Sequence, residues 1–243
     1  MSSINSKQAH SDEWISISDL MAGLMFLFLL IAVFFMSQAQ KKIDATEPFI
    51  LEYLMTREDI CDGLENEFRD DIEKWDGVID CLNLAVRFQQ PEVLFEAGQA
   101  DLRPEFEDIL NDFFPRYVGV LKPYQDRIRE LRIEGHTSSD WKDKSGFEAY
   151  KENMRLSQDR TRSVLTFLAD LTPVRQMWDG WLKASLTANG LSSSRPILFA
   201  DTGSEDASQS RRVEFRVEID AGALLDSISD GIKVSSLVRE AGS

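Results

Sequence analysis

An uninterrupted apolar run near the N-terminus is the strongest hydrophobic pattern in the chain. Residues 20–36 contain no polar side chain, and together with residues 15–19 they reach the length that crosses a bilayer as one helix. We therefore predict a single transmembrane helix over residues 14–36, preceded by a short N-terminal segment over residues 1–13. A cleaved signal peptide would need a shorter apolar core and a small-residue cleavage site directly after it.

The predicted membrane helix contains one ionisable side chain, Asp19. A carboxylate at membrane depth costs about 2.5–3.5 kcal/mol, so such residues usually face protein or water. Ala22 and Gly23 share the helical face of Asp19 and would let a second helix approach closely. The residues alone leave two interpretations open. Asp19 either faces a partner helix or caps the start of the span, where its charge suits the helix dipole.

The chain after the span is polar at first and then becomes periodic. Residues 37–47 are mostly polar and predict a linker. Between residues 60 and 75 apolar positions recur at helical spacing with acidic residues between them. This pattern predicts an amphipathic helix that ends at the turn signal Asp76-Gly77. We assign residues 37–81 to the linker and the amphipathic helix.

Alternating apolar and polar residues predict strands further along the chain, separated by helical patterns. Strands are expected over residues 82–88, 130–135, 186–190 and 213–219, and helices over residues 104–114, 146–171 and 173–182. The resulting order, β-α-β-α-β-β, predicts the α+β fold class, a sandwich with helices on one face of a sheet. Residues 201–210 are expected to form a flexible acidic loop, and residues 221–243 a tail.

The charge balance excludes several kinds of partner. A net charge of −15 and an isoelectric point near 4.6 argue against nucleic acid, which needs a basic groove for its phosphates. They also argue against broad contact with anionic lipid headgroups, although the span itself implies a lipid bilayer. The two histidines, His10 and His136, match no metal-binding motif. We therefore expect no metal and no cofactor.

Two cysteines and the absence of catalytic motifs complete the chemical inventory. Cys61 and Cys81 could pair in an oxidising compartment and close a loop of about 20 residues, or stay as two buried thiols; the sequence leaves both open. Serine, histidine and aspartate are present without a nucleophile elbow or a paired-acid motif, which argues against a hydrolase.

Lys41 and Lys42 follow the span, so the positive-inside rule alone would place the large domain in the cytoplasm.

Five segments carry a resemblance to a known domain family. They are VLFEAGQADLRPEF (93–106), IEGHTS (133–138), NMRLSQDRTRSV (153–164), Asn189-Gly190 with Arg195-Pro196, and RRVEFRVEI (211–219). In this order they resemble the OmpA-like peptidoglycan-binding domain, which we assign to residues 82–220. The resemblance implies a periplasmic domain that binds the diaminopimelate-containing stem peptide. It outweighs the two lysines and implies that the N-terminus is cytoplasmic.

The same resemblance implies a set of peptidoglycan-binding residues. They are Asn153, Leu156, Arg160, Ser138, Asp140 and Arg212. By resemblance, Arg160 would hold the ligand carboxylate through charge-assisted hydrogen bonds, a task for which lysine is less suited. Ser138 stands where the family usually has the aspartate that meets the ligand ammonium, with Asp140 two residues on. Glu152 replaces the usual tyrosine, and Tyr150 lies nearby. The alternative for Arg160 is an ordinary solvated helix arginine.

The first part of the chain resembles a second family. The segment WISISDLMAGLMFLF (14–28) is similar to the membrane helix of MotB-type stator B-subunits, in which an aspartate is followed closely by methionine and two small residues. The resemblance implies two copies of this helix inside a ring of A-subunits, with Asp19 taking up and releasing the translocated ion. Loss of water around the carboxylate favours its neutral form, which suits a proton carrier. Sodium is the alternative ion.

The short polar lead, together with GHTSSDW (135–141) and NMRLSQDRTRSVL (153–165), resembles the B-subunit family of the Zorya anti-phage system most. That resemblance implies a single-pass protein of the bacterial inner membrane. It also implies a homodimer inside a ring of ZorA-like subunits, expected to be a pentamer. Two alternatives stay open: a flagellar stator subunit with the same physics, and a passive wall tether in which Asp19 only caps its helix.

Overall fold

The computed structural model describes residues 3–89, 91–96, 98–177 and 180–222, without the side chains of residues 3–19, 42–49, 91–92 and 177. The chain divides into two units, Met1–Leu51 and Glu52–Ser243. The predicted tail over residues 223–243 lies outside the described residues.

Helix α1 (Ser3–Phe68) supplies the backbone of the first unit. Its segment Leu20–Lys41 is long and apolar enough to cross a membrane, with a mean hydropathy of 2.6. Every side chain from Leu20 to Met36 is exposed. Because a helix that is apolar all round needs lipid or protein around it, this segment is a candidate membrane span. The side chain of Asp19, one residue before the segment, lies outside the described residues.

Helix α1 continues through residues 37–47, so the residues predicted to form a linker are helical. These residues include neither glycine nor proline, and alanine, glutamine and lysine are good helix formers, so polarity alone does not interrupt the helix. The amphipathic helix expected over residues 60–75 instead ends at Phe68. The chain then turns, and Asp76 adopts a left-handed φ of 48°.

The described part of the second unit contains a five-stranded sheet in the order β1-β2-β5-β3-β4. The strands are β1 (Gly77–Asp80), β2 (Ala85–Phe88), β3 (Ile128–His136), β4 (Leu186–Gly190) and β5 (Arg212–Ile219). Strands β3 and β4 are parallel, and the other neighbouring pairs are antiparallel. Four strands were predicted and are confirmed, β4 with the predicted bounds and β2, β3 and β5 with shifted ends. Strand β1 was missed because four residues beside a turn carry too little periodicity.

The second unit also contains several helices after α1. They are α2 (Pro91–Leu94), α3 (Pro104–Leu121), the 3₁₀ helix η1 (Lys122–Arg127), α4 (Gly146–Asp170), α5 (Thr172–Met177), α6 (Gly180–Ser185) and α7 (Ala207–Ser210). Helices α3 and α4 confirm the predictions. The helix expected over residues 173–182 corresponds to α5 and α6, on either side of residues 178–179, which lie outside the described residues. The loop expected over residues 201–210 contains α7, because Asp206 caps it by accepting hydrogen bonds from the backbone amides of Ser208 and Gln209.

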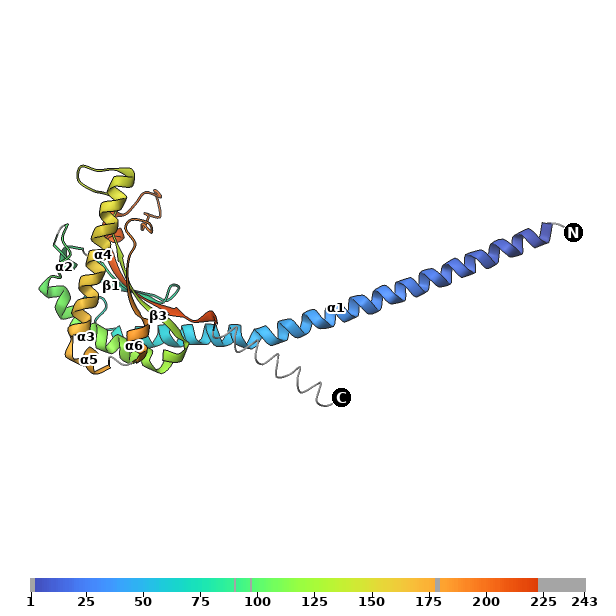
Figure 1. The fold of residues 1–243 in the computed structure, drawn as a ribbon, viewed down its shortest axis with the longest axis horizontal. Helices are drawn as coiled ribbons and strands as arrows, with labels where there is room; N and C mark the ends of the chain where they lie inside the picture. The colour runs from blue at the N-terminus through green and yellow to red at the C-terminus, as the bar shows by residue number, and fades with distance from the viewer. Residues whose placement is uncertain (1–2, 90, 97, 178–179, 223–243) are drawn as a thin grey trace. The chain divides into compact units, whose positions relative to one another are not determined.

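The core lies between one face of the sheet and the helices, as predicted for the α+β sandwich. Figure 1 shows α3 and α4 along the same side of the sheet. Phe113 of α3 is central, because its ring centroid lies 5.0 Å from those of Phe68, Phe88 and Phe215. Phe68 belongs to the end of α1, so the folded unit begins well before residue 82.

Helix α4 approaches the sheet unusually closely at two glycines. A Cβ atom on Gly190 would lie 2.3 Å from the backbone nitrogen of Gln158, and one on Gly135 would lie 2.9 Å from the carbonyl oxygen of Ser157. Neither position therefore has room for a side chain. The approach fixes the height of the N-terminal half of α4 above β3 and β4.

A disulfide joins Cys61 of α1 to Cys81 after β1, with 5.4 Å between their Cα atoms. Nearby, Nη2 of Arg57 donates a hydrogen bond to the carbonyl oxygen of Leu82 at 2.5 Å. These contacts hold the end of α1 against the turn between β1 and β2.

Gly190→Ala should lower the free energy of unfolding by about 3 kcal/mol, because the new methyl group overlaps the α4 backbone. Gly119→Ala is the matched control, since its Cβ meets nothing within 4 Å on the exposed side of α3, and it should stabilise by about 1 kcal/mol. Denaturant unfolding followed by tryptophan fluorescence measures both. Equal midpoints for Gly190→Ala and wild type would contradict the close approach.

Replacing Cys61 and Cys81 together by serine should lower the free energy of unfolding by about 3 kcal/mol, because the unfolded chain is no longer closed into a loop. Thermal unfolding with and without reductant measures this. Reductant should lower the unfolding temperature of wild type to that of the double variant and leave the unfolding temperature of the variant unchanged. If reductant does not change the unfolding temperature of wild type, the thiols are free.

Candidate functional site

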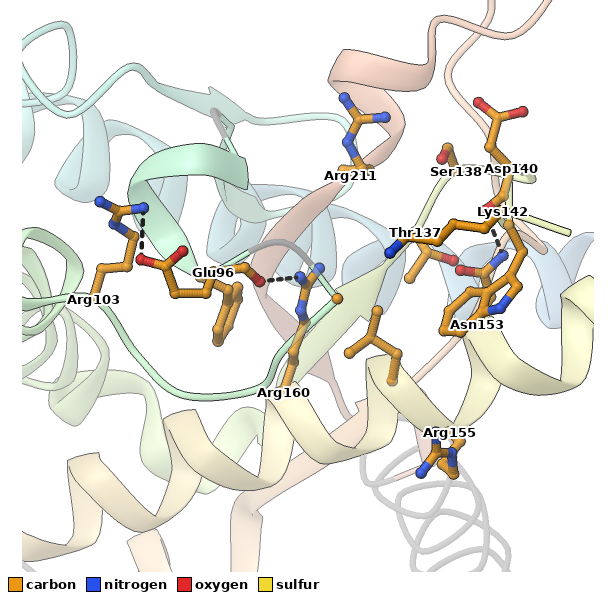
Figure 2. A pocket seen from close by; sticks show the side chains of 14 residues that line it. Glu96, Arg103, Thr137, Ser138, Asp140, Lys142, Asn153, Arg155, Arg160 and Arg211 are labelled. Carbon is orange, nitrogen blue, oxygen red and sulfur yellow. Dashed lines mark hydrogen bonds and ion pairs between the residues drawn. The ribbon is translucent and has the colours of Figure 1, made fainter.

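A pocket of about 740 Å³ opens between α4, the loop after β3 and the segment that precedes α3. Of the predicted binding residues, five line it: Ser138, Asp140, Asn153, Leu156 and Arg160. Figure 2 shows that Asn153 and Arg160 come from α4, while Ser138 and Asp140 come from the loop. Asn153, Leu156 and Arg160 share one helical face because they are three and seven residues apart.

Arg160 is held at the pocket wall by contacts with the segment before α3. Its side chain donates from Nε to the carbonyl oxygen of Gln99 at 2.9 Å and from Nη2 to that of Glu96 at 3.4 Å. The guanidinium carbon lies 4.7 Å from the ring centroid of Phe95, within range of a cation–π interaction. Arg160 is only 7% exposed, so the solvated-arginine interpretation does not fit this structure.

The electrostatics of Arg160 leave it available to an anion. Burial and, to a smaller extent, the neighbouring charge of Arg211 together lower the pKa of Arg160 to about 10. The group therefore still carries its charge at neutral pH. Among the described residues no carboxylate forms an ion pair with it. A buried guanidinium of this kind is stabilised when a ligand carboxylate reaches it.

Hydrogen bonds to three other segments of the chain hold the loop after β3 in place. The amide of Thr137 donates to the carbonyl oxygen of Ser192 at 3.0 Å, and Nδ2 of Asn153 donates to that of Asp140 at 3.2 Å. The amide of Ser139 donates to a Glu205 carboxylate oxygen at 3.0 Å. Sequence reasoning missed Glu205, which lies in the stretch expected to be a flexible loop.

Two hydroxyl groups of this loop line the pocket wall. Ser138 is 4% exposed and Thr137 is 3% exposed. The Thr137 hydroxyl is buried without a hydrogen-bond partner in the described part of the chain. Glu152, at the position of the family's tyrosine, does not line the pocket; its carboxylate pairs with Lys144 and, at 3.5 Å, with Arg155.

Arg212 lies on the opposite face of the sheet from the pocket, and its neighbour Arg211 lines the pocket instead. In β5 the core-facing residues are Val213 and Phe215. A strand alternates faces, so Arg211 shares their side and Arg212 does not. The same alternation could have identified Arg211 from the sequence.

Arg212 belongs to a buried ladder of ion pairs. Its Nε lies 2.6 Å from Oε1 of Glu214. On the neighbouring strand β3, His136 is paired with Arg212 and Glu134 with Glu214. Burial alone would raise the pKa of Glu214, but the charge and hydrogen bond of Arg212 outweigh it and hold this pKa at about 2. Burial lowers the pKa of His136, which favours its neutral form.

The ladder includes three potential metal ligands. Glu134, His136 and Glu214 place ligand atoms within 4.8 Å of one another. Arginine guanidinium groups already occupy the carboxylate oxygens, with Arg216 bridging Glu134 at 3.3 Å and Glu214 at 2.8 Å. A divalent cation would have to displace these charges, so we assign the cluster to ion pairing within the sheet.

No family model matches the chain. Among solved structures, a MotB-like protein from Desulfovibrio vulgaris is 24% identical with a TM-score of 0.48, covering 70% of this chain and 98% of its own. The cell wall anchor of the T6SS from Pseudomonas aeruginosa is 24% identical with a TM-score of 0.43, covering 65% and 97%. The assignment of this chain to a family does not rest on these structures.

Sequence relatives decide the family. Zorya protein ZorB of Escherichia coli O139:H28 (strain E24377A / ETEC) is 26% identical over 224 residues, covering 87% of this chain and 84% of the relative. Zorya protein ZorB of Escherichia coli strain Crooks is 43% identical over 216 residues, covering 88% of this chain and 91% of the relative. At that identity and coverage, the chain belongs to the ZorB family of Zorya proteins.

Proposed function

We propose that this chain is the wall-anchored B-subunit of an ion-driven motor complex of the inner membrane that acts in defence against phage. Membership of the ZorB family supports the system, and the candidate span over Leu20–Lys41 supports the membrane location. The second unit then lies in the periplasm and the N-terminus in the cytoplasm. The disulfide between Cys61 and Cys81 is in keeping with an oxidising compartment.

The observation that carries the anchoring proposal is the buried Arg160 on the pocket wall. It is oriented by two backbone carbonyls and a phenyl ring, and no described acid neutralises it. In this proposal Arg160 binds a carboxylate of the diaminopimelate-containing stem peptide. Asn153 and the hydroxyl groups of Thr137 and Ser138 orient the rest of the ligand.

The ion-carrying part of the proposal rests on Asp19. The residue directly precedes the apolar segment, and a ring of ZorA-like subunits around two copies of this chain would enclose it. A carboxylate removed from water takes up a proton readily, and renewed water access releases it. Sodium is the alternative ion. A passive tether and a flagellar stator are the competing functions, and the first experiment below separates the tether from the motor.

Asp19→Asn should abolish protection against phage, because an amide cannot exchange a proton, while leaving membrane insertion and retention on sacculi unchanged. Efficiency of plating on cells carrying the complete system measures this. Asp12→Asn, ahead of the span, is the matched control and should protect like wild type. Full protection by Asp19→Asn would favour the passive tether, and restored swimming of a stator-deficient strain would favour the flagellar function.

Arg160→Ala should reduce retention on isolated sacculi about 10- to 100-fold, since charge-assisted hydrogen bonds contribute roughly 1.5–3 kcal/mol. Arg162→Ala is the matched control, because Arg162 is two residues further along α4 with its side chain 75% exposed. Co-sedimentation of the purified full chain measures retention. Arg160→Lys keeps the positive charge but loses the paired donors of the guanidinium, so its retention should lie between that of wild type and that of Arg160→Ala. Retention of all variants at the wild-type level would refute the anchoring proposal.

A further inference from the structure

The pocket is cationic although the chain as a whole is strongly acidic. Arg160, Lys142 and Arg211 all line it, and in the described part of the chain none of them forms an ion pair. Arg160 and Arg211 are close enough for their charges to interact. In Figure 2 the Lys142 side chain extends from the loop toward the side of the pocket that holds Arg160. The net charge of the whole chain is −15, so the pocket is opposite in sign to the chain as a whole.

The acidic groups at the pocket do not offset this charge. Glu96 is bound by Arg103, whose Nη1 lies 3.0 Å from its carboxylate. Asp140 is exposed, and Figure 2 shows its carboxylate directed away from Arg160. Thr137 and Ser138 contribute neutral hydroxyl groups to the wall, and Asn153 contributes a neutral amide. A ligand ammonium placed among these groups would meet three cations and no inward-facing carboxylate.

We propose that this pocket binds the cross-linked form of the wall peptide in preference to the free form. Cross-linking acylates the side-chain amine of diaminopimelate and turns an ammonium into a neutral amide, while the carboxylates stay. The amide can donate hydrogen bonds to the hydroxyl groups of the wall and accept hydrogen bonds from them. Because it is neutral, it is not repelled by the positive charges of Lys142 and Arg211. This inference rests on the proposed anchoring function and specifies its ligand.

Two synthetic probes test the preference. One is the tripeptide L-alanyl-γ-D-glutamyl-meso-diaminopimelate with its side-chain amine free, and the other is the same tripeptide with that amine acetylated. Calorimetric titration of the full chain in detergent should give about fivefold tighter binding of the acetylated probe at low salt, with a smaller ratio at high salt as the charges are screened.

Variants identify the residues responsible. Lys142→Gln should bring the ratio of the two affinities within about twofold of unity, because one repelling charge is removed. Ser138→Asp should reverse the preference by placing a carboxylate on the inner wall. Lys183→Gln, an exposed lysine of α6 outside the pocket, is the matched control and should keep the wild-type ratio.

The possible results distinguish failure of the ligand preference from failure of the proposed anchoring function. Equal binding of both probes by wild type, tighter binding of the free amine, or an unchanged ratio in Lys142→Gln would overturn the preference alone. Failure of both probes to bind would overturn the anchoring function, and the preference with it. Because Lys142 is exposed, its substitution tests the inference even if Ser138→Asp does not fold.

Discussion

The packing of α4 against β3 and β4 is the contact on which the pocket depends. At Gly135 and Gly190 the strands come so close to the helix that a methyl group would overlap its backbone. This contact sets the position of Asn153 and Arg160 relative to the loop after β3. The hydroxyl of Ser157 adds to it by accepting a hydrogen bond at 3.0 Å from the amide of Ser192. The pocket is therefore built on a rigid helix–sheet interface, to which the loop after β3 and the segment before α3 add the rest of the wall.

Strand β5 shows how one element serves two environments. Its core-facing residues pack against helices, whereas Arg212, Glu214 and Arg216 on the other face belong to the ion-pair ladder. Such a ladder contributes less net stability than its number of contacts implies, because each buried charge has lost its water. Breaking one partner would nevertheless leave an uncompensated charge. Arg211, one residue before the strand, does not belong to this ladder and lines the pocket instead.

The charge of the pocket differs in sign from that of the whole chain. An acidic surface disfavours nonspecific binding of polyanions, while three cations collected in one pocket create a locally positive potential. The energetic requirement is that Arg160 stay charged although buried. Its backbone hydrogen bonds and its contact with Phe95 meet that requirement. The pocket thus combines a fixed guanidinium with a neutral inner wall.

The sequence by itself determined the apolar segment, helices α3 and α4 and four strands, because each follows a local hydrophobic period. It also determined that Asn153, Leu156 and Arg160 share a face, since that follows from helical spacing alone. Only the tertiary structure decided that α1 runs on through residues 37–47, and that β1 pairs with β2 at the sheet edge. It likewise decided that Glu205 fastens the loop after β3, and that Lys142 and Arg211 join Arg160 in one pocket. The last two features depend on contacts between segments far apart in the chain, which no local period encodes. The helical residues 37–47 and the β1–β2 hairpin are local, but a polar helix and a four-residue strand have too weak a hydrophobic period to be recognised.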